Sequence, residues 1–478
     1  MARQAACGSV KSLKGYEAFQ DLFPAWQKRY EPLCVFQRKV DSKMDISTPA
    51  LVSMLALLAI VLFSCFRDVN VGIMGIAAGL IVGMAFAGMK ISAVYKGWPL
   101  NLFMILVGVT FMFSAAQVNG TMEKFSAMCV RLAKGNVALI PLIIFCLVTI
   151  ITTIGPGNIA TTALLAPVAM AIAARIELSP FCMTLLVVGA ANGAAFSPFA
   201  PAGLISNGII AQIAPTIGIP AEMLDSIAWK VHWNSEIVQG IVNIGGFLIC
   251  GGAAWMVRAR KSKDFDINTI APKPEPLTWK QMYTLATVAI LVIGVIFFKL
   301  DVGAVAFVIG TTYILFDIAD DKASVKAMPW GVILMVCGMS VLINVMDKAG
   351  GLNALVDMIA TVSNETTVTG VCAFISGLIS AYSSSSGVVM PMFLNMVPGL
   401  LEAVGATSVE SAISLISAID VGSHLVDTSP LSTLGALCIA NAYTSDKGAL
   451  FRNLLFWGLA MSVVSGLMCY VIFGLLGF

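Results

Sequence analysis

The stretch Ile154-Gly-Pro-Gly-Asn-Ile-Ala-Thr-Thr162 decides how this chain folds. It interrupts an apolar run that begins near Ile140 and continues to Ala173. A proline between two glycines does not continue a helix well, and Asn158 brings polar atoms to a depth where unpaired polar groups are costly. Non-helical backbone within a membrane is tolerated only where protein buries it or it lines a cavity. The stretch therefore predicts a re-entrant hairpin of two half-length helices with a polar tip; the alternative is one long helix with a glycine kink.

The composition places the chain in a lipid bilayer. Of its 478 residues, 58% are hydrophobic and 11% are charged, against about 25% charged in an average soluble domain. We therefore expect an all-α polytopic membrane protein, located in the plasma (inner) membrane. The net charge of +2 gives no indication of a nucleic-acid partner. The cysteines form no CxxC pair and the histidines are His232 and His424, so we expect no cofactor and no metal beyond Na⁺.

Two series of apolar segments flank a basic, proline-containing linker at 258–280. A full span needs about 20 apolar residues. The first series has spans at 49–66, 70–89 and 100–118, a hairpin at 137–176, a broken segment at 180–213, an interfacial stretch at 222–235 and a span at 236–257. The second series has spans at 281–298, 302–318 and 329–347, a hairpin at 368–402, a broken segment at 411–443 and a span at 450–476.

The two series indicate a duplication. Gly338 follows Gly108, and Gly387 follows Gly157, by 230 residues, while Ser429-Pro430 follows Ser197-Pro198 by 232. We therefore predict a first repeat at 44–257 and a second at 281–478. Each repeat has five transmembrane helices plus one re-entrant hairpin, with broken helices at the midplane, and the odd number of crossings inverts the second repeat. Corresponding interrupted segments in two halves are the best sequence pointer to a transporter's binding site.

The basic residues give the orientation. With the 258–280 linker inside, most Lys and Arg after residue 43 also fall inside, as the positive-inside rule requires. The first hairpin then opens to the cytoplasm and the second to the outside. The basic tail at 1–43 would lie outside, against the same rule. It is either an additional membrane-associated element or not part of the functional chain, which would then begin near Met44.

The two tips carry groups that suit an anionic substrate and a small cation. Helix N-termini present N–H groups and a partial positive charge to a carboxylate, whereas unwound carbonyls with Asn, Ser and Thr oxygens suit Na⁺. An Asn at the first tip also serves as a helix cap, threonines there also bond back within a helix, and a Ser-rich second tip is also typical of a flexible turn. The substrate-binding candidates at the tips are Asn158, Thr161, Thr162, Ser384, Ser385 and Ser386.

The broken segments add further candidates. Proline suits the first position of a helix, so Ser197-Pro198 and Thr428-Ser429-Pro430 are predicted to end one half-helix, start the next and contact substrate; the alternative is a plain kink. Ionisable residues inside a membrane are functional by default, although an Asp–His pair also holds a broken helix together. The candidates for a cation or proton site are Gly157, Asn158, Gly193, Gly387, Asp420, His424 and Asp427.

These residues resemble the ion transporter superfamily. Its divalent anion/sodium symporters carry a Ser-Asn-Thr tip where this chain has Gly157-Asn158-Ile159, and Pro167 follows the Asn at their spacing. The second tip, Ser386-Gly387-Val388, has no Asn. These departures point to the related malonate/dicarboxylate carrier family, which the first half resembles, particularly 137–210. The resemblance implies a scaffold domain that dimerises and a mobile transport domain with elevator-type movement.

We therefore expect a secondary active transporter, a symporter that imports a small dicarboxylate such as malonate or a C4-dicarboxylate with Na⁺ or H⁺. Its partners would be the anionic substrate, the bilayer and a second copy in a homodimer. The alternative is a cation/proton antiporter of the same superfamily, with Asp420 and Asp427 as the proton-exchanging acids. A channel is disfavoured because hairpins entering from opposite sides suit alternating access. An enzyme is disfavoured because the sequence offers no nucleophile–base pair and no metal set.

Overall fold

The computed structural model describes residues 46–67, 69–130, 137–259 and 275–477. All regular elements in these ranges are helical, and eight helical segments are long and apolar enough to cross a membrane. This confirms the prediction of an all-α polytopic membrane protein. The predicted tail at 1–43 and most of the predicted linker at 258–280 lie outside the described residues.

The described helices lie before or after the predicted linker, and we call these two sets the first and the second series. The first series is α4 (Thr48–Phe66), α5 (Val71–Ile81), α6 (Ile91–Tyr95), α7 (Leu100–Val118), α8 (Thr121–Val130), α9 (Ile140–Ile154), α10 (Gly157–Arg175), α11 (Pro180–Ala194), α12 (Pro201–Ile213), α13 (Leu224–Phe247) and α14 (Ala253–Ala259). The second series is α16 (Trp279–Phe298), α17 (Val302–Leu315), α18 (Asp321–Ala327), α19 (Trp330–Lys348), α20 (Gly351–Thr361), α21 (Val368–Ser380), α22 (Met390–Val404), α23 (Val409–Leu425), α24 (Thr433–Asn441) and α25 (Lys447–Cys469).

The order of long, short and interrupted helices is the same in both series. The short helices α6 and α18 each precede a 19-residue helix, α7 or α19, and α8 and α20 each follow it after a tight turn. The predicted spans include none of α6, α8, α18 and α20. These four helices are too short to give the apolar signal of a span, so they escape a prediction based on apolar runs.

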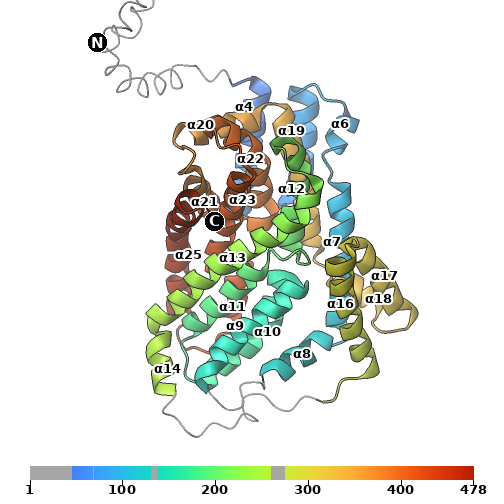
Figure 1. Ribbon diagram of the computed structural model, residues 1–478, viewed down its shortest axis with the longest axis vertical. Helices are drawn as coiled ribbons and strands as arrows, with labels where there is room; N and C mark the ends of the chain where they lie inside the picture. Colours follow the sequence, from blue (N-terminus) through green and yellow to red (C-terminus); the bar gives the residue numbers. More distant parts are fainter. Residues whose placement is uncertain (1–45, 68, 131–136, 260–274, 478) are drawn as a thin grey trace, which may run out of the picture.

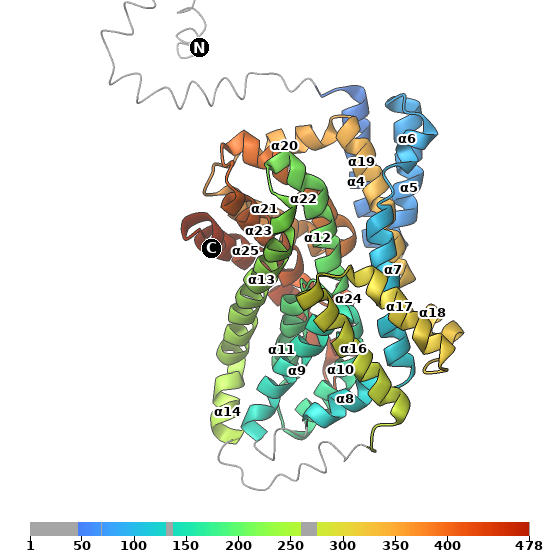
Figure 2. The same ribbon diagram turned by 45° about the vertical axis from the view of Figure 1, so that its right-hand side comes forward.

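Helices α4–α7 and α16–α20 make a frame in which the two series cross at glycines. α19 packs along α5, and α17 packs along α7. A Cβ on Gly338 would overlap the backbone of Gly72, and a Cβ on Gly108 would lie 2.6 Å from the carbonyl oxygen of Gly303. Small residues allow such close backbone approach between membrane helices. Figures 1 and 2 show α7, α17 and α18 along one edge of the molecule.

The remaining helices form a second group that holds the two helix pairs and the two broken segments. α9 packs against α10 and α11, while α21 packs against α23 and α25. In Figure 1, α9 and α10 lie toward the end of the molecule that contains α8 and α14, whereas α21 and α22 lie toward the end that contains α20. The two helix pairs, whose turns are at 155–156 and 381–384, therefore lie toward opposite ends of the molecule.

One predicted element differs in the structure. The stretch 222–235, expected to be a separate interfacial segment, belongs mostly to the continuous helix α13. Its polar residues divide into two groups: Glu222, Asp225 and Lys230 are exposed, whereas His232, Asn234 and Ser235 are buried within the protein. Asn234 Nδ2, for example, donates to Ser417 Oγ at 2.9 Å. The helix changes course near Gly251, whose φ of 112° is non-helical.

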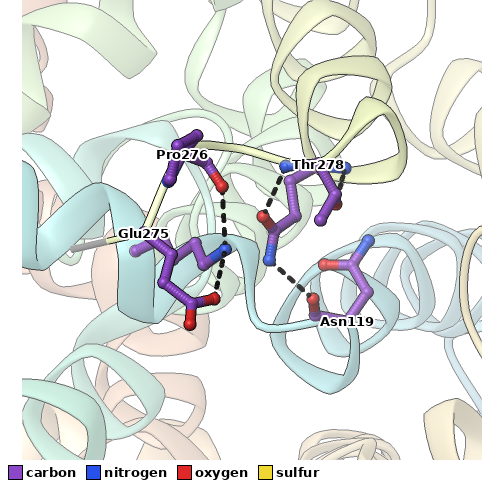
Figure 3. A network of polar contacts seen from close by, with 6 residues as sticks. Asn119, Glu275, Pro276 and Thr278 are labelled. Atoms are coloured by element: carbon purple, nitrogen blue, oxygen red, sulfur yellow. Dashed lines mark hydrogen bonds and ion pairs between the residues drawn. The ribbon is translucent and has the colours of Figure 1, made fainter.

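The start of the second series is tied to the end of α7. Figure 3 shows this network, in which Gln281 Nε2 donates to the carbonyl oxygen of Asn119 at 3.2 Å while Gln281 Oε1 accepts from the backbone N–H of Thr278 at 3.0 Å. The latter bond belongs to a capping box that begins α16. Lys124 Nζ also donates to the carbonyl oxygen of Pro276 at 3.0 Å. The second series thus starts from a fixed position on the first.

Candidate functional site

The two turns and the frame enclose a cavity of about 540 Å³. The first turn contributes residues 155–161, the second contributes 382–386, and the chain around the start of α24 contributes 431–434 together with Asp427. The frame contributes Thr110, Ser114 and Gln117 of α7 and the beginning of α19. We call residues 155–158 the first tip and residues 382–387 the second tip.

The first tip depends on glycine. Gly155 and Gly157 have φ values of 147° and 84°, a region that side chains other than glycine rarely adopt. A Cβ on Gly155 would also overlap the ring of Phe113. The turn places Asn158, 9% exposed, in the first turn of α10. Its Nδ2 donates to Asn192 Oδ1 at 3.0 Å, and its Oδ1 accepts the N–H of Ile159 at 3.0 Å.

The second tip depends on serine. Ser384 Oγ accepts the N–H of Gly387 at 3.1 Å and begins a π-helical turn, Ser385–Val389, that leads into α22. Ser385 Oγ donates to Asp427 Oδ1 at 2.8 Å and accepts from Ser380 Oγ at 2.7 Å. Ser386 Oγ lies 2.9 Å from His424 Nε2. The tip is therefore held by hydroxyl groups and by the second broken segment.

The two broken segments are built alike. α11 ends at Ala194 and α12 begins at Pro201, while α23 ends at Leu425 and α24 begins at Thr433. A Cβ on Gly203 would overlap the carbonyl oxygen of Ser197, and a Cβ on Gly435 would overlap that of Ser429. The chain therefore folds back on itself in the same way at both breaks. This confirms that 180–213 and 411–443 are interrupted.

A chain of hydrogen bonds joins the two tips through these segments. Asn192 Oδ1 accepts from Asn158, and Asn192 Nδ2 donates to the backbone oxygen of His424 at 2.9 Å. The side chain of His424 then contacts Ser386 through Nε2, and its ring lies edge-on to Phe196 with 4.7 Å between the centroids. The first tip, both broken segments and the second tip are thus one connected polar unit.

The predicted substrate residues fall into two groups. Five of them line the cavity: Asn158, Thr161, Ser384, Ser385 and Ser386. The other predicted residues lie outside the cavity wall: Thr162 on α10, and Ser197, Pro198, Thr428, Ser429 and Pro430 at the breaks. Ser197 Oγ, for example, donates to the carbonyl oxygen of Thr153 at 2.6 Å and so attaches the break to α9.

The predicted cation or proton residues divide in the same way. Gly157, Asn158 and Asp427 line the cavity. Gly387 packs against Met335, and Gly193 faces Glu236, whose Oε2 would lie 2.7 Å from an added Cβ. Asp420 is fully buried and accepts from Ser206 Oγ at 2.6 Å through Oδ2, while Oδ1 has no partner in the described chain.

Three cavity-lining residues of the frame escaped the sequence analysis. Thr110, Ser114 and Gln117 of α7 line the cavity and are spaced i, i+4, i+7, which places them on one face of the helix. This polar stripe within an apolar span is a sequence signal that points to a cavity. The second tip also contributes Ser383, whose buried Oγ lines the cavity and has no partner in the described chain.

The cavity has no basic side chain among its described lining residues, and Asp427 is its acidic one. The positive field comes instead from the beginnings of α10, at Gly157, and of the π-helical turn before α22, at Ser385. Helix N-termini carry unsatisfied N–H groups and about half a positive charge. The arrangement suits a ligand with two separated anionic groups.

A comparison with known protein families gave a match within the first half of the chain. Residues 47–195 match the family described as the dicarboxylate carrier protein MatC N-terminus. This range runs from the start of α4 to the end of α11 and includes the first tip and Asn192. No curated protein matches the chain. The match supports the resemblance to the malonate/dicarboxylate carriers over that range.

Proposed function

We propose that the protein is a secondary active transporter that moves a small dicarboxylate with Na⁺ or H⁺ across the membrane. The main observation in support is the cavity. Two helix N-termini, one from each helix pair, line it. Its described lining residues include no basic side chain. Each N-terminus provides N–H groups for one carboxylate. The family match at 47–195 supports a carrier over an enzyme.

A coupling cation reduces the charge imbalance of this proposal. A dicarboxylate brings two negative charges into a cavity whose acidic lining residue is Asp427. Two helix dipoles offset about one unit charge, and a co-bound Na⁺ or a proton on Asp427 offsets one more. The oxygens of Asn158, Thr161 and Asp427 are the proposed cation ligands, since oxygen atoms are preferred by hard cations.

A second cavity supports alternating access by two inverted repeats. It has a volume of about 940 Å³ and lies at the other end of α12, between α7, α19, α20 and α22. Its frame residues are the counterparts, 230 positions away, of those in the first cavity. The pairs are Pro99 and Pro329, Leu102 and Val332, Thr110 and Ser340, Ser114 and Asn344, Gln117 and Asp347, and Met122 and Leu352.

The second cavity also indicates the size of the movement. On α22 it contacts residues 395–402, whereas the second tip ends near residue 387. Ten residues of helix correspond to about 15 Å. An elevator-type shift of this order along α22 would bring the tips from the first cavity to the second. In this proposal the frame is the scaffold, pairs with a second copy as a homodimer in the plasma membrane, and stays in place.

A cation/proton antiporter is the second candidate. The observation that favours it is the buried pair of carboxyl groups on one segment, Asp420 with a free Oδ1 and Asp427 at the cavity wall. In that case the two acids exchange a proton for a cation, and no organic substrate enters the cavity.

Uptake by proteoliposomes separates the candidates. Labelled malonate and succinate are supplied outside, with an inward Na⁺ gradient, an inward proton gradient, or neither. Accumulation of either dicarboxylate above its equilibrium level, dependent on one gradient, is the expected result. Na⁺-dependent proton release without uptake of either acid would establish the antiporter instead.

A further inference from the structure

Asn192 lies outside the cavity but joins the two halves of the molecule behind the first tip. It belongs to α11 and is 1% exposed. Its Nδ2 donates to the backbone oxygen of His424 at 2.9 Å, and its Oδ1 accepts from Asn158 Nδ2 at 3.0 Å. One amide group therefore contacts both the backbone of α23 and the side chain of the first tip.

The carbonyl of His424 fixes the orientation of both amides. A carbonyl oxygen only accepts hydrogen bonds, so Asn192 must turn its NH₂ group toward α23 and its oxygen toward Asn158. Asn158 must then turn its own NH₂ group toward Asn192. The oxygen of Asn158 is left on the opposite side, where it accepts the N–H of Ile159 and keeps a second lone pair.

The same helix contacts the second tip. His424 Nδ1 lies 2.9 Å from Ser423 Oγ and 3.2 Å from the carbonyl oxygen of Asp420, and its Nε2 lies 2.9 Å from Ser386 Oγ. Which of these atoms donate follows from the tautomer of the ring. The backbone carbonyl of His424 therefore sets the polarity of the first tip, at Asn158, whereas the ring of His424 sets that of Ser386.

We propose that Asn192 is a positioning residue that sets the polarity of Asn158, so that the first tip offers an oxygen, and not an N–H group, to a bound cation. The inference rests on the proposed function in taking the cation to be a hard monovalent ion, for which Na⁺ is the probe. Without Asn192, the N–H of Ile159 is the remaining group that orients the amide of Asn158, and the amide presents NH₂ to the site in part of the population. An NH₂ group repels a cation, so affinity falls although Asn158 itself is intact.

The test compares two buried asparagines that bridge to the same helix. Asn192→Ala removes the two hydrogen bonds that join Asn158 to α23. Asn234→Ala removes a comparable bond, from Asn234 Nδ2 to Ser417 Oγ on α23 at 2.9 Å. Asn234 does not line the cavity and does not contact Asn158 or Asn192 through these bonds. If Asn192→Ala does not fold, Asn192→Leu keeps the volume without the polarity. The full chain is purified, and the apparent Kd for Na⁺ is taken from Na⁺-dependent thermal stabilisation.

We expect Asn192→Ala to raise the apparent Kd for Na⁺ about tenfold, as the loss of one oriented hydrogen bond allows, and Asn234→Ala to leave it within about twofold. In proteoliposomes the Na⁺ dependence of dicarboxylate uptake should shift by the same factor, with little change in the maximal rate. Equal effects of the two variants, or no Na⁺ binding by the unaltered protein, would overturn the inference. If Na⁺ binds and depends on Asn192 but no dicarboxylate is transported, the inference stands and the proposed function fails.

Discussion

The two tips occupy equivalent places in the two halves but achieve their shape by different means. The first is a Gly-Pro-Gly turn with one polar side chain, Asn158, held by a single partner on α11. The second has four consecutive serines, of which three bond to the tip itself or to the second broken segment. The order of the elements is the same, whereas the chemistry is not.

This difference indicates how strongly a single substitution affects each tip. At the first tip, shape comes from backbone freedom and chemistry from one amide, so each can be lost by a single substitution. At the second tip, the same hydroxyls hold the turn and line the cavity. The remaining serines therefore compensate in part when one hydroxyl is removed. We expect a concentrated cation site at the first tip and a distributed carboxylate site at the second.

Asn158→Ala should have the largest effect. It removes the amide that contacts Asn192 and lines the cavity, and no neighbouring side chain replaces it. Uptake should become undetectable in proteoliposomes while the amount of folded protein, measured by size-exclusion chromatography, stays unchanged. Retained uptake would reduce Asn158 to a helix cap and remove the contrast between the tips.

Gly203→Ala and Gly435→Ala should destabilise the protein to a similar extent. In each case the new Cβ overlaps a carbonyl oxygen of the adjacent break, and overpacking of this kind costs about 1–3 kcal/mol. Thermal unfolding in detergent measures the effect. Gly240→Ala is the matched control, because a Cβ there meets nothing within 4 Å. A large drop for one break alone would show that the two are not built alike.

Ser385→Ala should change the coupling-ion dependence more than it weakens the fold. It removes the hydrogen-bond donor at 2.8 Å from Asp427 Oδ1, and a buried carboxylate that loses a partner costs about 1–3 kcal/mol. Because the carboxylate that has lost this donor is stabilised more by a bound Na⁺ or proton, we expect a fall of roughly tenfold in the concentration of coupling ion needed for half-maximal uptake. An unchanged ion dependence with a raised KM for dicarboxylate would assign Ser385 to the substrate instead.

Ser383→Ala should have the smallest effect. Its hydroxyl is buried, lines the cavity and has no partner in the described chain, so the fold loses nothing when it is removed. One neutral hydrogen bond to a substrate is worth about 0.5–1.5 kcal/mol, which corresponds to a rise of roughly two- to tenfold in KM. A KM that stays the same, together with a higher melting temperature, would exclude Ser383 from the substrate site.

The sequence predicted the breaks better than their surroundings. Gly155, Gly157, Pro198 and Pro430 are local signals, because each limits what the backbone can do regardless of the rest of the chain. The roles of Ser197 and Asn192 depend instead on contacts with residues 44 and 232 positions away. Periodicity contains no information on such contacts. The candidates at the breaks therefore included residues that hold the turn as well as residues that line the cavity.

The glycine crossings of the frame have a consequence for biosynthesis. Gly72 meets Gly338, and Gly108 meets Gly303, so each crossing joins one helix from each half. During translation α5 and α7 are made long before α17 and α19. Until then, the glycine faces of α5 and α7 have no helix from the second half to pack against. The frame is completed only when the second half arrives. A chain that ends after the first half would therefore remain a substrate for membrane quality control.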